Sequence, residues 1–462
     1  MYRKYSSVFI VVYALLITAC DEPEIAEQSC TLEDKNEAIV SIFESDYLFN
    51  EDVQVPADYQ VLPSADLVEA LKVNGKEDFS FWVEDAVAFD QSFGQGISTG
   101  KFGFRPIYIE SDTGNVEDDR LTFYVVEKNS PAYEAGLRRG DAILSIDGIS
   151  KNEIFTFLKN NDDDKDVVNA YHMYLFGYDN EKQSLHFVWR SSEDSSVYEA
   201  TIERGSYTTN VIETSSVIDN AGQTTGYFAY RSFAKYSAEE LYDSFEYFSD
   251  QNVDNLILDL RSNSGGLVSL ATAIVNSSLN ARNSHSQLPM LNYEFNSLQS
   301  INNRTFSFWD NTYDIGASEV VVLIDSGSCS ASELVINMML PYANVTVIGD
   351  HASCGKPFAM PQIPICGSIL FPVTMQMTNA NNEGNYINGF NPDCVVADTL
   401  MYNWGNVNDP QIDEALHILN GGSCRTQMEA VALESRNLKK SNKHFQSSTY
   451  LDYENSNSIL IK

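Results

Sequence analysis

The spacing of apolar residues changes along the chain, and each spacing predicts a different kind of element. Near the N-terminus, apolar positions recur every three or four residues, as on one face of a helix: Ala38, Ile39, Ile42, Phe43 and Tyr47. A second helix is predicted around Leu67 to Leu71, with Ser64 or Asp66 as its N-cap. Residues 30–96 therefore predict a small helical domain.

The next segment changes to strands and tight turns. Residues 125–141 combine an apolar strand, a helix that begins at Pro131, and a glycine turn. Polar and apolar residues then alternate over 184–191 and 196–203, which predicts two half-buried strands. Together these elements predict a β-rich domain over residues 97–206.

An insertion is predicted within this domain, over residues 151–180. It contains the acidic run Asp162 to Asp164, for which a calcium site is the alternative to a solvated loop. The run lacks the ligand spacing of an EF-hand, so the solvated loop is favoured.

Strands and helices alternate from residue 207 onwards, which predicts an α/β core over 207–424. The predicted elements are a strand at 226–230, a helix at 238–248, a strand at 253–260, a helix at 334–340 and a strand at 345–349. Residues 279–318 are rich in Asn and Ser and predict an irregular segment. Residues 425–462 are polar and predict a flexible tail. The fold class is therefore α/β and multidomain.

The N-terminus has the pattern of an export signal. Basic residues are followed by an apolar run from Val8 to Ala19, which is shorter than the ~18 residues of a membrane span. The residues before Cys20 are similar to a bacterial lipobox, which predicts a signal peptide over 1–19, lipidation of Cys20 and a tether over 20–29. An ordinary cleavage site is the alternative. The lipobox indicates a lipid-anchored protein of the bacterial cell envelope that faces the periplasm. The sequence does not determine whether the anchor lies in the inner or the outer membrane.

The charge of the chain restricts its partners. It carries 65 acidic and 29 basic residues, for a formal net charge of −36 at pH 7. Nucleic acid and anionic membrane surfaces are therefore disfavoured as partners, because both would repel such a chain.

Six cysteines remain once Cys20 is set aside from the seven. An even number in an exported protein predicts disulfides, although the sequence does not determine the pairing. Proximity along the chain favours Cys354–Cys366 and Cys394–Cys424, which leaves Cys30–Cys329. Zinc is the alternative, but no CxxC pair and no histidine at ligand spacing accompanies the cysteines, so no metal is expected.

Two residues carry the candidate chemistry. Ser330 precedes the predicted helix at 334–340, and Lys356 follows the strand at 345–349. A neutral lysine can act as the base for a serine nucleophile, and burial favours the neutral form because it lowers the pKa. The N–H of Ala331, with that of Gly265 or Gly266, could stabilise an oxyanion. Asp259 and Arg261 are interpreted as a structural ion pair.

These motifs resemble those of the C-terminal processing peptidases, which are S41-type serine proteases with a Ser-Lys dyad and a PDZ domain. The resemblance covers most of residues 30–424 and rests on Ser-Ala-Ser-Glu at 330–333, Gly-Lys at 355–356, the segment 258–266 and the PDZ-like segment 125–148. It implies a crotonase-like α/β spiral as the protease core, no cofactor, and protein substrates with free C-termini. It also implies that the loop containing Phe102, Gly103 and Phe104 receives the substrate tail.

The chain departs from this family at two points. Many members have a glutamine four residues after the lysine, where this chain has Met360, and Gln362 lies two residues further on. The spacing from Ser330 to Lys356 is also one residue longer than usual. These departures leave open which group orients Lys356.

Two alternatives stand beside the Ser-Lys peptidase. One is a non-catalytic binding protein built on a PDZ domain and a protease fold, which the intact Ser, Lys and Gly-Gly motifs disfavour. The other is a Ser-His protease that uses His351, the histidine nearest in sequence to Ser330. The sequence determines neither an adaptor nor an oligomeric state.

Overall fold

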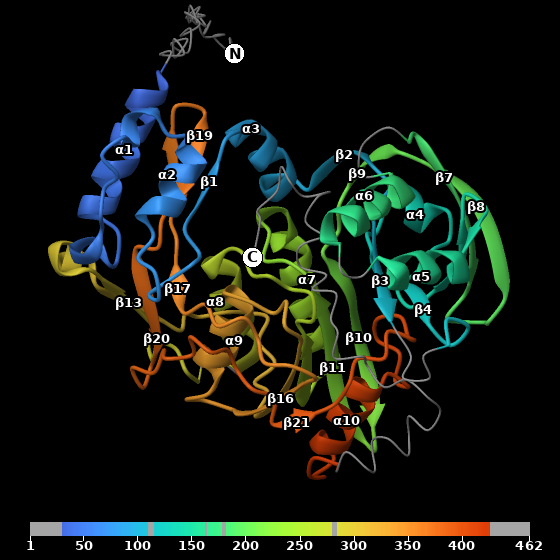
Figure 1. Ribbon diagram of the computed structural model, residues 1–462. Helices are drawn as coiled ribbons and strands as arrows, with labels where there is room; N and C mark the ends of the chain where they lie inside the picture. Colours follow the sequence, from blue (N-terminus) through green and yellow to red (C-terminus); the bar gives the residue numbers. More distant parts are fainter. Residues whose placement is uncertain (1–29, 110–114, 162–163, 178–181, 280–283, 426–462) are drawn as a thin grey trace, which may run out of the picture.

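The computed structural model describes residues 30–109, 115–161, 164–177, 182–279 and 284–425. The predicted signal peptide, Cys20, the tether and nearly all of the polar tail lie outside these residues. In Figure 1, the N-terminal helices lie on one side of the molecule and the β-rich region lies on the other, with the largest group of helices and strands between them. Within the described part of the chain, no helix combines the length and apolar character needed to cross a bilayer.

The N-terminal region is mainly helical. Its elements are α1 (Leu32–Ser45), η1 (Asn50–Asp52), η2 (Tyr59–Val61), α2 (Ser64–Leu71), β1 (Phe81–Val83), α3 (Ala86–Phe89) and η3 (Asp90–Gly94). Helix α1 begins at a capping box in which Thr31 and Asp34 satisfy each other's backbone N–H groups.

The core of this region includes residues from much later in the chain. Ile39 and Phe43 of α1 pack in one apolar cluster with Leu370 and Val373. Strand β1 pairs with β19 (Ser368–Phe371), which pairs in turn with β18 (Ile363–Ile365). The N-terminal region is therefore built onto the hairpin that follows Lys356.

The β-rich region contains one mainly antiparallel sheet in the order β3-β4-β5-β7-β8, with β6 paired to β5. Its strands are β3 (Phe104–Ile109), β4 (Arg120–Val126), β5 (Ala142–Ile146), β6 (Ile149–Ser150), β7 (Ser184–Arg190) and β8 (Val197–Glu203). Strand β2 (Ile97–Lys101) pairs separately with β9 (Gly205–Thr208). Strand β3 is an edge strand, so one side of its backbone is not paired within the sheet.

Three helices accompany this sheet: α4 (Pro131–Glu134), α5 (Lys151–Asn160) and α6 (Lys165–Phe176). The last two fall in the segment interpreted as an insertion. Phe155 of α5 and Phe176 of α6 are nevertheless buried in the same apolar cluster as the strands. This segment therefore completes the core of the β-rich region.

The α/β core is built on a six-stranded sheet in the order β10-β11-β12-β15-β16-β21. These strands are β10 (Ile212–Asn220), β11 (Gln223–Tyr230), β12 (Asn255–Asp259), β15 (Glu319–Ile324), β16 (Asn344–Gly349) and β21 (Cys394–Val395). The strands from β11 to β21 are parallel, and β10 forms an antiparallel hairpin with β11.

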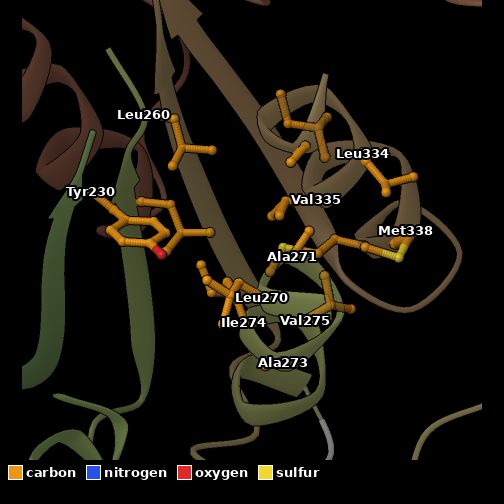
Figure 2. Close-up of a cluster of buried hydrophobic side chains, with 14 of the residues drawn as sticks. Tyr230, Leu260, Leu270, Ala271, Ala273, Ile274, Val275, Leu334, Val335 and Met338 are labelled. Carbon is orange, nitrogen blue, oxygen red and sulfur yellow. The ribbon is translucent and has the colours of Figure 1, made fainter. Parts of the chain in front are cut away.

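Helices cover both faces of this sheet because its apolar residues alternate in direction. Phe228, Leu258 and Val322 pack against α7 (Ala238–Asp250), α8 (Val268–Leu279) and α9 (Ala331–Met339), whereas Tyr227, Ile257 and Val321 pack against α10 (Pro410–Leu419). Figure 2 shows side chains of α8 and α9 meeting in the first of these clusters, close to Tyr230 and Leu260. This packing fixes the N-terminal end of α9, where Ser330 lies.

A second sheet and two short helices complete the core. The sheet has the order β14-β13-β20-β17 and contains β13 (Pro289–Phe295), β14 (Arg304–Ser307), β17 (Phe358–Ala359) and β20 (Met375–Asn379), while the short helices are η4 (Lys235–Ser237) and η6 (Ser297–Asn302). Two of these strands lie within residues 279–318, so the prediction of an irregular segment there is wrong. This segment is rich in Asn and Ser, but it also contains Leu291 and Tyr293, whose side chains are buried on one side of β13.

Three disulfides join cysteines of the described residues, and two of the predicted pairings are wrong. Cys394 pairs with Cys424 as expected, but Cys30 pairs with Cys366 and Cys329 with Cys354. The prediction Cys354–Cys366 relied on proximity along the chain, and Cys30–Cys329 was the pair that remained. Parallel pairing of β15 with β16 instead brings Cys354 beside Cys329, and pairing of β1 with β19 brings the turn at Cys366 to the start of α1.

Candidate active site

A cleft of about 880 Å³ lies where the N-terminal region, the β-rich region and the α/β core meet. It is lined by η3 and its neighbours, by residues of β2 and β3, and by loops of the core. Ser330, Lys356, Gly265 and Gly266 all line this cleft. The fold therefore brings these four predicted residues together from three separate loops.

Ser330 lies in a tight turn between β15 and α9. Its backbone has φ 55° and ψ −109°, a left-handed conformation that is uncommon for a residue with a side chain. The turn is held on both sides, because Cys329 N–H donates to Asn263 O (3.0 Å) and Ser330 N–H donates to a Glu333 oxygen (3.0 Å). Strain of this kind at a cleft is an indication of a functional residue.

The two glycines have different environments. A Cβ on Gly265 would lie 2.8 Å from Ser330 Cβ and 3.0 Å from Ala331 N, so only glycine fits there. Gly265 N–H already donates to Asn263 Oδ1 (2.9 Å), and Gly265 O accepts from Phe233 N–H (3.0 Å). Because C=O and N–H point in opposite directions across a trans peptide, Gly266 N–H points away from Phe233. Among the described residues, neither Gly266 N–H nor Ala331 N–H has a hydrogen-bond acceptor.

Lys356 is buried, with a relative exposure of 7%. Its ammonium lies 5.3 Å from the ring centroid of Phe79, in the segment that connects α2 to β1. Burial lowers the pKa of Lys356 to about 8, and the charges of Glu77 and Glu333 oppose this shift. Glu77 is itself held by Tyr47 Oη (2.7 Å) and Ser80 Oγ (2.7 Å). The N-terminal region therefore supplies part of the environment of Lys356, which no motif in the sequence indicated.

Glu333 joins the two candidate catalytic segments. One carboxylate oxygen accepts from Ser353 Oγ (2.6 Å) and Gly355 N–H (2.7 Å), and the other accepts from Ser330 N–H (3.0 Å) and Lys356 N–H (2.8 Å). Burial raises the pKa of the Glu333 carboxyl, and these hydrogen bonds favour its charged form. One carboxylate thus fixes the backbones of both Ser330 and Lys356.

A covalent connection lies beside this hydrogen-bonded one. The Cys329–Cys354 disulfide has a Cα–Cα distance of 5.1 Å and joins the residue before Ser330 to a residue two positions before Lys356. Cys329 is therefore not a free thiol that could serve as the nucleophile.

The two residues involved in the family departure lie at the cleft, whereas His351 lies outside it. Met360 and Gln362 both line the cleft. His351 does not line it; its side chain is 41% exposed, and its Nδ1 lies 2.9 Å from Asp350 Oδ1. No histidine of the described chain lines the cleft.

Arg261 belongs to a buried ion network next to the glycine loop. Its guanidinium lies 2.5 Å from Asp259, 3.1 Å from Asp409 and 3.4 Å from Asp398. Asp398 also pairs with Arg139 of the β-rich region at 2.5 Å. This agrees with a structural role for Asp259 and Arg261, and it connects the β-rich region to the strand that leads into residues 262–266.

The loop expected to receive a substrate tail has its two phenylalanine rings in the core of the β-rich region. Phe102 and Phe104 are 0% and 1% exposed and belong to the apolar cluster of the β-rich region. A Cβ on Gly103 would lie 2.1 Å from Ser130 Cβ, so the loop packs tightly against the N-cap of α4. The neighbouring Lys101 and Arg105 line the cleft instead. The two phenylalanine rings therefore fill the core, and reception of a substrate tail by this loop stays a prediction.

Comparison with known proteins places this site in a family context. The family model for peptidase family S41 matches residues 224–396, and a PDZ domain model matches residues 122–151. A carboxyl-terminal-processing protease of Synechocystis is 24% identical over 67% of this chain and 67% of its own length. The carboxy-terminal processing protease CtpB of Bacillus subtilis is 23% identical over 66% of this chain and 57% of its own length.

The structural comparison agrees with these matches. A crystal structure from Bacteroides fragilis assigned to the S41 proteases superposes with a TM-score of 0.64 at 20% identity, over 83% of this chain and 97% of that one. At this identity the likeness shows the fold. The resemblance to C-terminal processing peptidases and the α/β multidomain fold class are thus confirmed, and the matches support a peptidase. Residues 224–396 of this chain match the model of peptidase family S41, and residues 122–151, which precede them, match a PDZ domain model.

Proposed function

We propose that this protein is a serine endopeptidase of the cell envelope, with Ser330 as nucleophile and Lys356 as general base. The observation that carries the proposal is a buried lysine, with its pKa lowered to about 8, in the same cleft as a serine in a strained turn. A lysine with a pKa near the working pH is partly neutral and can accept the serine proton. The Glu333 carboxylate supports the assignment because it holds both segments.

The reaction would proceed by acyl transfer. Ser330 Oγ attacks the substrate carbonyl carbon and transfers its proton to Lys356 Nζ. Ala331 N–H and Gly266 N–H donate to the oxyanion, and these two are preferred because Gly265 N–H is already bonded to Asn263. Lys356 then returns the proton to the leaving amine, and water hydrolyses the acyl-enzyme with the same lysine as base.

Substrate capture is assigned to the PDZ region. Edge strand β3 offers an unpaired backbone to which an extended C-terminal tail could add as a further strand. Arg105 on this strand lines the cleft that contains Ser330, so a tail held there would extend toward the proposed nucleophile. Lipidation of Cys20 would anchor the enzyme to the membrane with these regions facing the periplasm.

A serine-directed fluorophosphonate probe tests the proposal against a non-catalytic binding protein. The native chain is expected to be labelled at Ser330, while Ser330→Ala is not. Absence of labelling and of peptide cleavage in the native chain would contradict the proposed activity.

The pH dependence of cleavage should follow Lys356. The base form of the lysine is required, so kcat/KM should increase with pH through an apparent midpoint near 8. A pH–rate profile on a fluorogenic peptide, from pH about 6 to about 10, checks this. A midpoint near the ~6.5 of histidine would instead favour Ser-His chemistry.

The terminal carboxylate of a tail should contribute to binding. In the Ser330→Ala background, which prevents turnover, an apolar-ended peptide acid is expected to bind at least about tenfold more tightly than its C-terminal amide. Fluorescence anisotropy with a labelled peptide measures both affinities. Equal affinity for the peptide acid and the peptide amide would show that the terminal carboxylate does not contribute to binding.

A further inference from the structure

The charge of the cleft is opposite to that of the chain. Acidic residues outnumber basic ones 65 to 29 in the whole sequence. Among the cleft-lining residues, basic side chains outnumber the two acidic ones, Asp90 and Glu127. The basic residues are Lys101, Arg105, Arg204, Arg231, Lys235, Arg304 and Lys356.

Several of these basic side chains have no carboxylate of the described residues to compensate their charge. Arg231 pairs with Glu213 and with Glu127. Within the part of the chain that the structure describes, four others have no carboxylate at ion-pair distance: Arg105, Arg204, Lys235 and Arg304. Uncompensated charge of one sign inside a concave site attracts a ligand of the opposite sign.

These four side chains differ in how freely they can contact a ligand. Arg204 donates to three backbone carbonyls, including Gly100 O at 2.8 Å, and Arg304 stacks on the rings of Tyr293 and Phe306. Arg105 is half-buried and Lys235 is exposed, and neither side chain donates a hydrogen bond to the described residues. The side-chain N–H groups of Arg105 and Lys235 are therefore available to bind a ligand.

The positions of these two residues match the proposed path of a substrate. Arg105 lies on β3, the edge strand to which a tail would add. Lys235 begins η4, directly after a segment bonded to the glycine loop through Phe233 N–H to Gly265 O (3.0 Å) and Leu267 N–H to Phe233 O (2.8 Å). Arg105 thus lies on the strand proposed to bind the tail, and Lys235 lies beside the loop proposed to hold the oxyanion.

We propose that the cleft selects protein tails that carry Asp or Glu side chains upstream of an apolar C-terminal residue, with Arg105 and Lys235 as specificity-determining residues. This inference rests on the proposed peptidase function and names its substrate class. The apolar end would find a complementary surface in the same cleft, on Phe81, Phe89, Phe93, Ile97, Met360 and Phe371. Acidic side chains would pair with the two cations that have no carboxylate partner.

A matched peptide series tests the charge preference. Each peptide has the same apolar C-terminus and differs upstream in two positions, which are both Glu, both Gln or both Lys. The native protein is expected to cleave the Glu peptide with a kcat/KM about tenfold above that of the Gln peptide, because two partly exposed ion pairs are gained. The Lys peptide should be the poorest substrate, and raising NaCl from about 0.05 M to about 0.5 M should reduce the preference.

Substitutions test whether the preference for acidic peptides depends on Arg105 and Lys235. In Arg105→Gln/Lys235→Gln, the ratio of kcat/KM for the Glu and Gln peptides should fall toward unity, and Arg105→Glu should favour the Lys peptide. Arg190→Gln is the matched control, because Arg190 is exposed on β7 and does not line the cleft. C-terminal amides of the same peptides distinguish side-chain carboxylates from the terminal one: the Glu-to-Gln ratio should persist in the amides.

The possible failures are distinguishable. Equal kcat/KM for Glu and Gln peptides, in a protein that cleaves both, would overturn the acidic preference and leave the peptidase intact. A preference retained in the double variant would overturn the roles of Arg105 and Lys235. If no peptide is cleaved and the serine probe does not react, the proposed function fails, and anisotropy with the same peptides still decides whether the cleft prefers acidic tails.

Discussion

Replacement of Lys356 by alanine is expected to lower kcat/KM by at least about 10³-fold, because it removes the base that activates the serine. Ser330→Ala should have an effect at least as large. The double variant should be little worse than either single one, since nucleophile and base act as a unit. Measurement of kcat/KM for the four proteins on one peptide, with circular dichroism to verify folding, tests this expectation.

The choice of substitution separates chemistry from packing. Lys356→Arg keeps a long cationic side chain but stays protonated at every accessible pH, so it should be as inactive as the alanine variant. His351→Ala should retain most activity, because His351 lies outside the cleft and contacts Asp350. An active Lys356→Ala enzyme beside an inactive His351→Ala enzyme would replace the Ser-Lys dyad with Ser-His chemistry.

The sequence predicted the local parts of this site well, because they depend on short motifs. The motifs at 330–333 and 355–356 indicate Ser330 and Lys356, and parallel pairing of β15 and β16 brings both to one cleft. The ion pair of Asp259 and Arg261 was predicted for the same reason. Each of these features depends on residues close together in sequence or at the end of a predicted strand.

Features that depend on contacts between distant segments were not predicted. Glu77 and Phe79 approach Lys356 only because β1 pairs with β19, and no local pattern reports that pairing. The same contact places Cys30 beside Cys366. The proposed preference for Gly266 over Gly265 as an oxyanion donor likewise rests on the bond from Gly265 N–H to Asn263, which no motif indicates. Phe102 and Phe104 show the converse case, since a motif identified the loop but could not show that its rings fill a core.

Glu333 provides the second large expected effect, because its carboxylate accepts from four donors that belong to both catalytic segments. Glu333→Gln has nearly the same shape, but its amide NH₂ cannot accept the two hydrogen bonds that one carboxylate oxygen accepts. Two donors, at least one of them a backbone N–H, would lose their acceptor, so we expect a loss of about 2–4 kcal/mol in the free energy of unfolding. Displacement of Ser330 or Lys356 should also lower kcat by about 10²-fold.

The pH profile of Glu333→Gln distinguishes positioning from a general loss of stability. The charge of Glu333 raises the pKa of Lys356 against the larger effect of burial, so its removal should shift the midpoint of kcat/KM to lower pH. Glu319→Gln is a suitable control, because Glu319 lies on β15 and bonds to the amide of Asn344 (2.7 Å), and it should change neither kcat nor the midpoint. A Glu333→Gln enzyme with normal kcat, or with its midpoint moved to higher pH, would show that this carboxylate does not hold the two segments in register for catalysis.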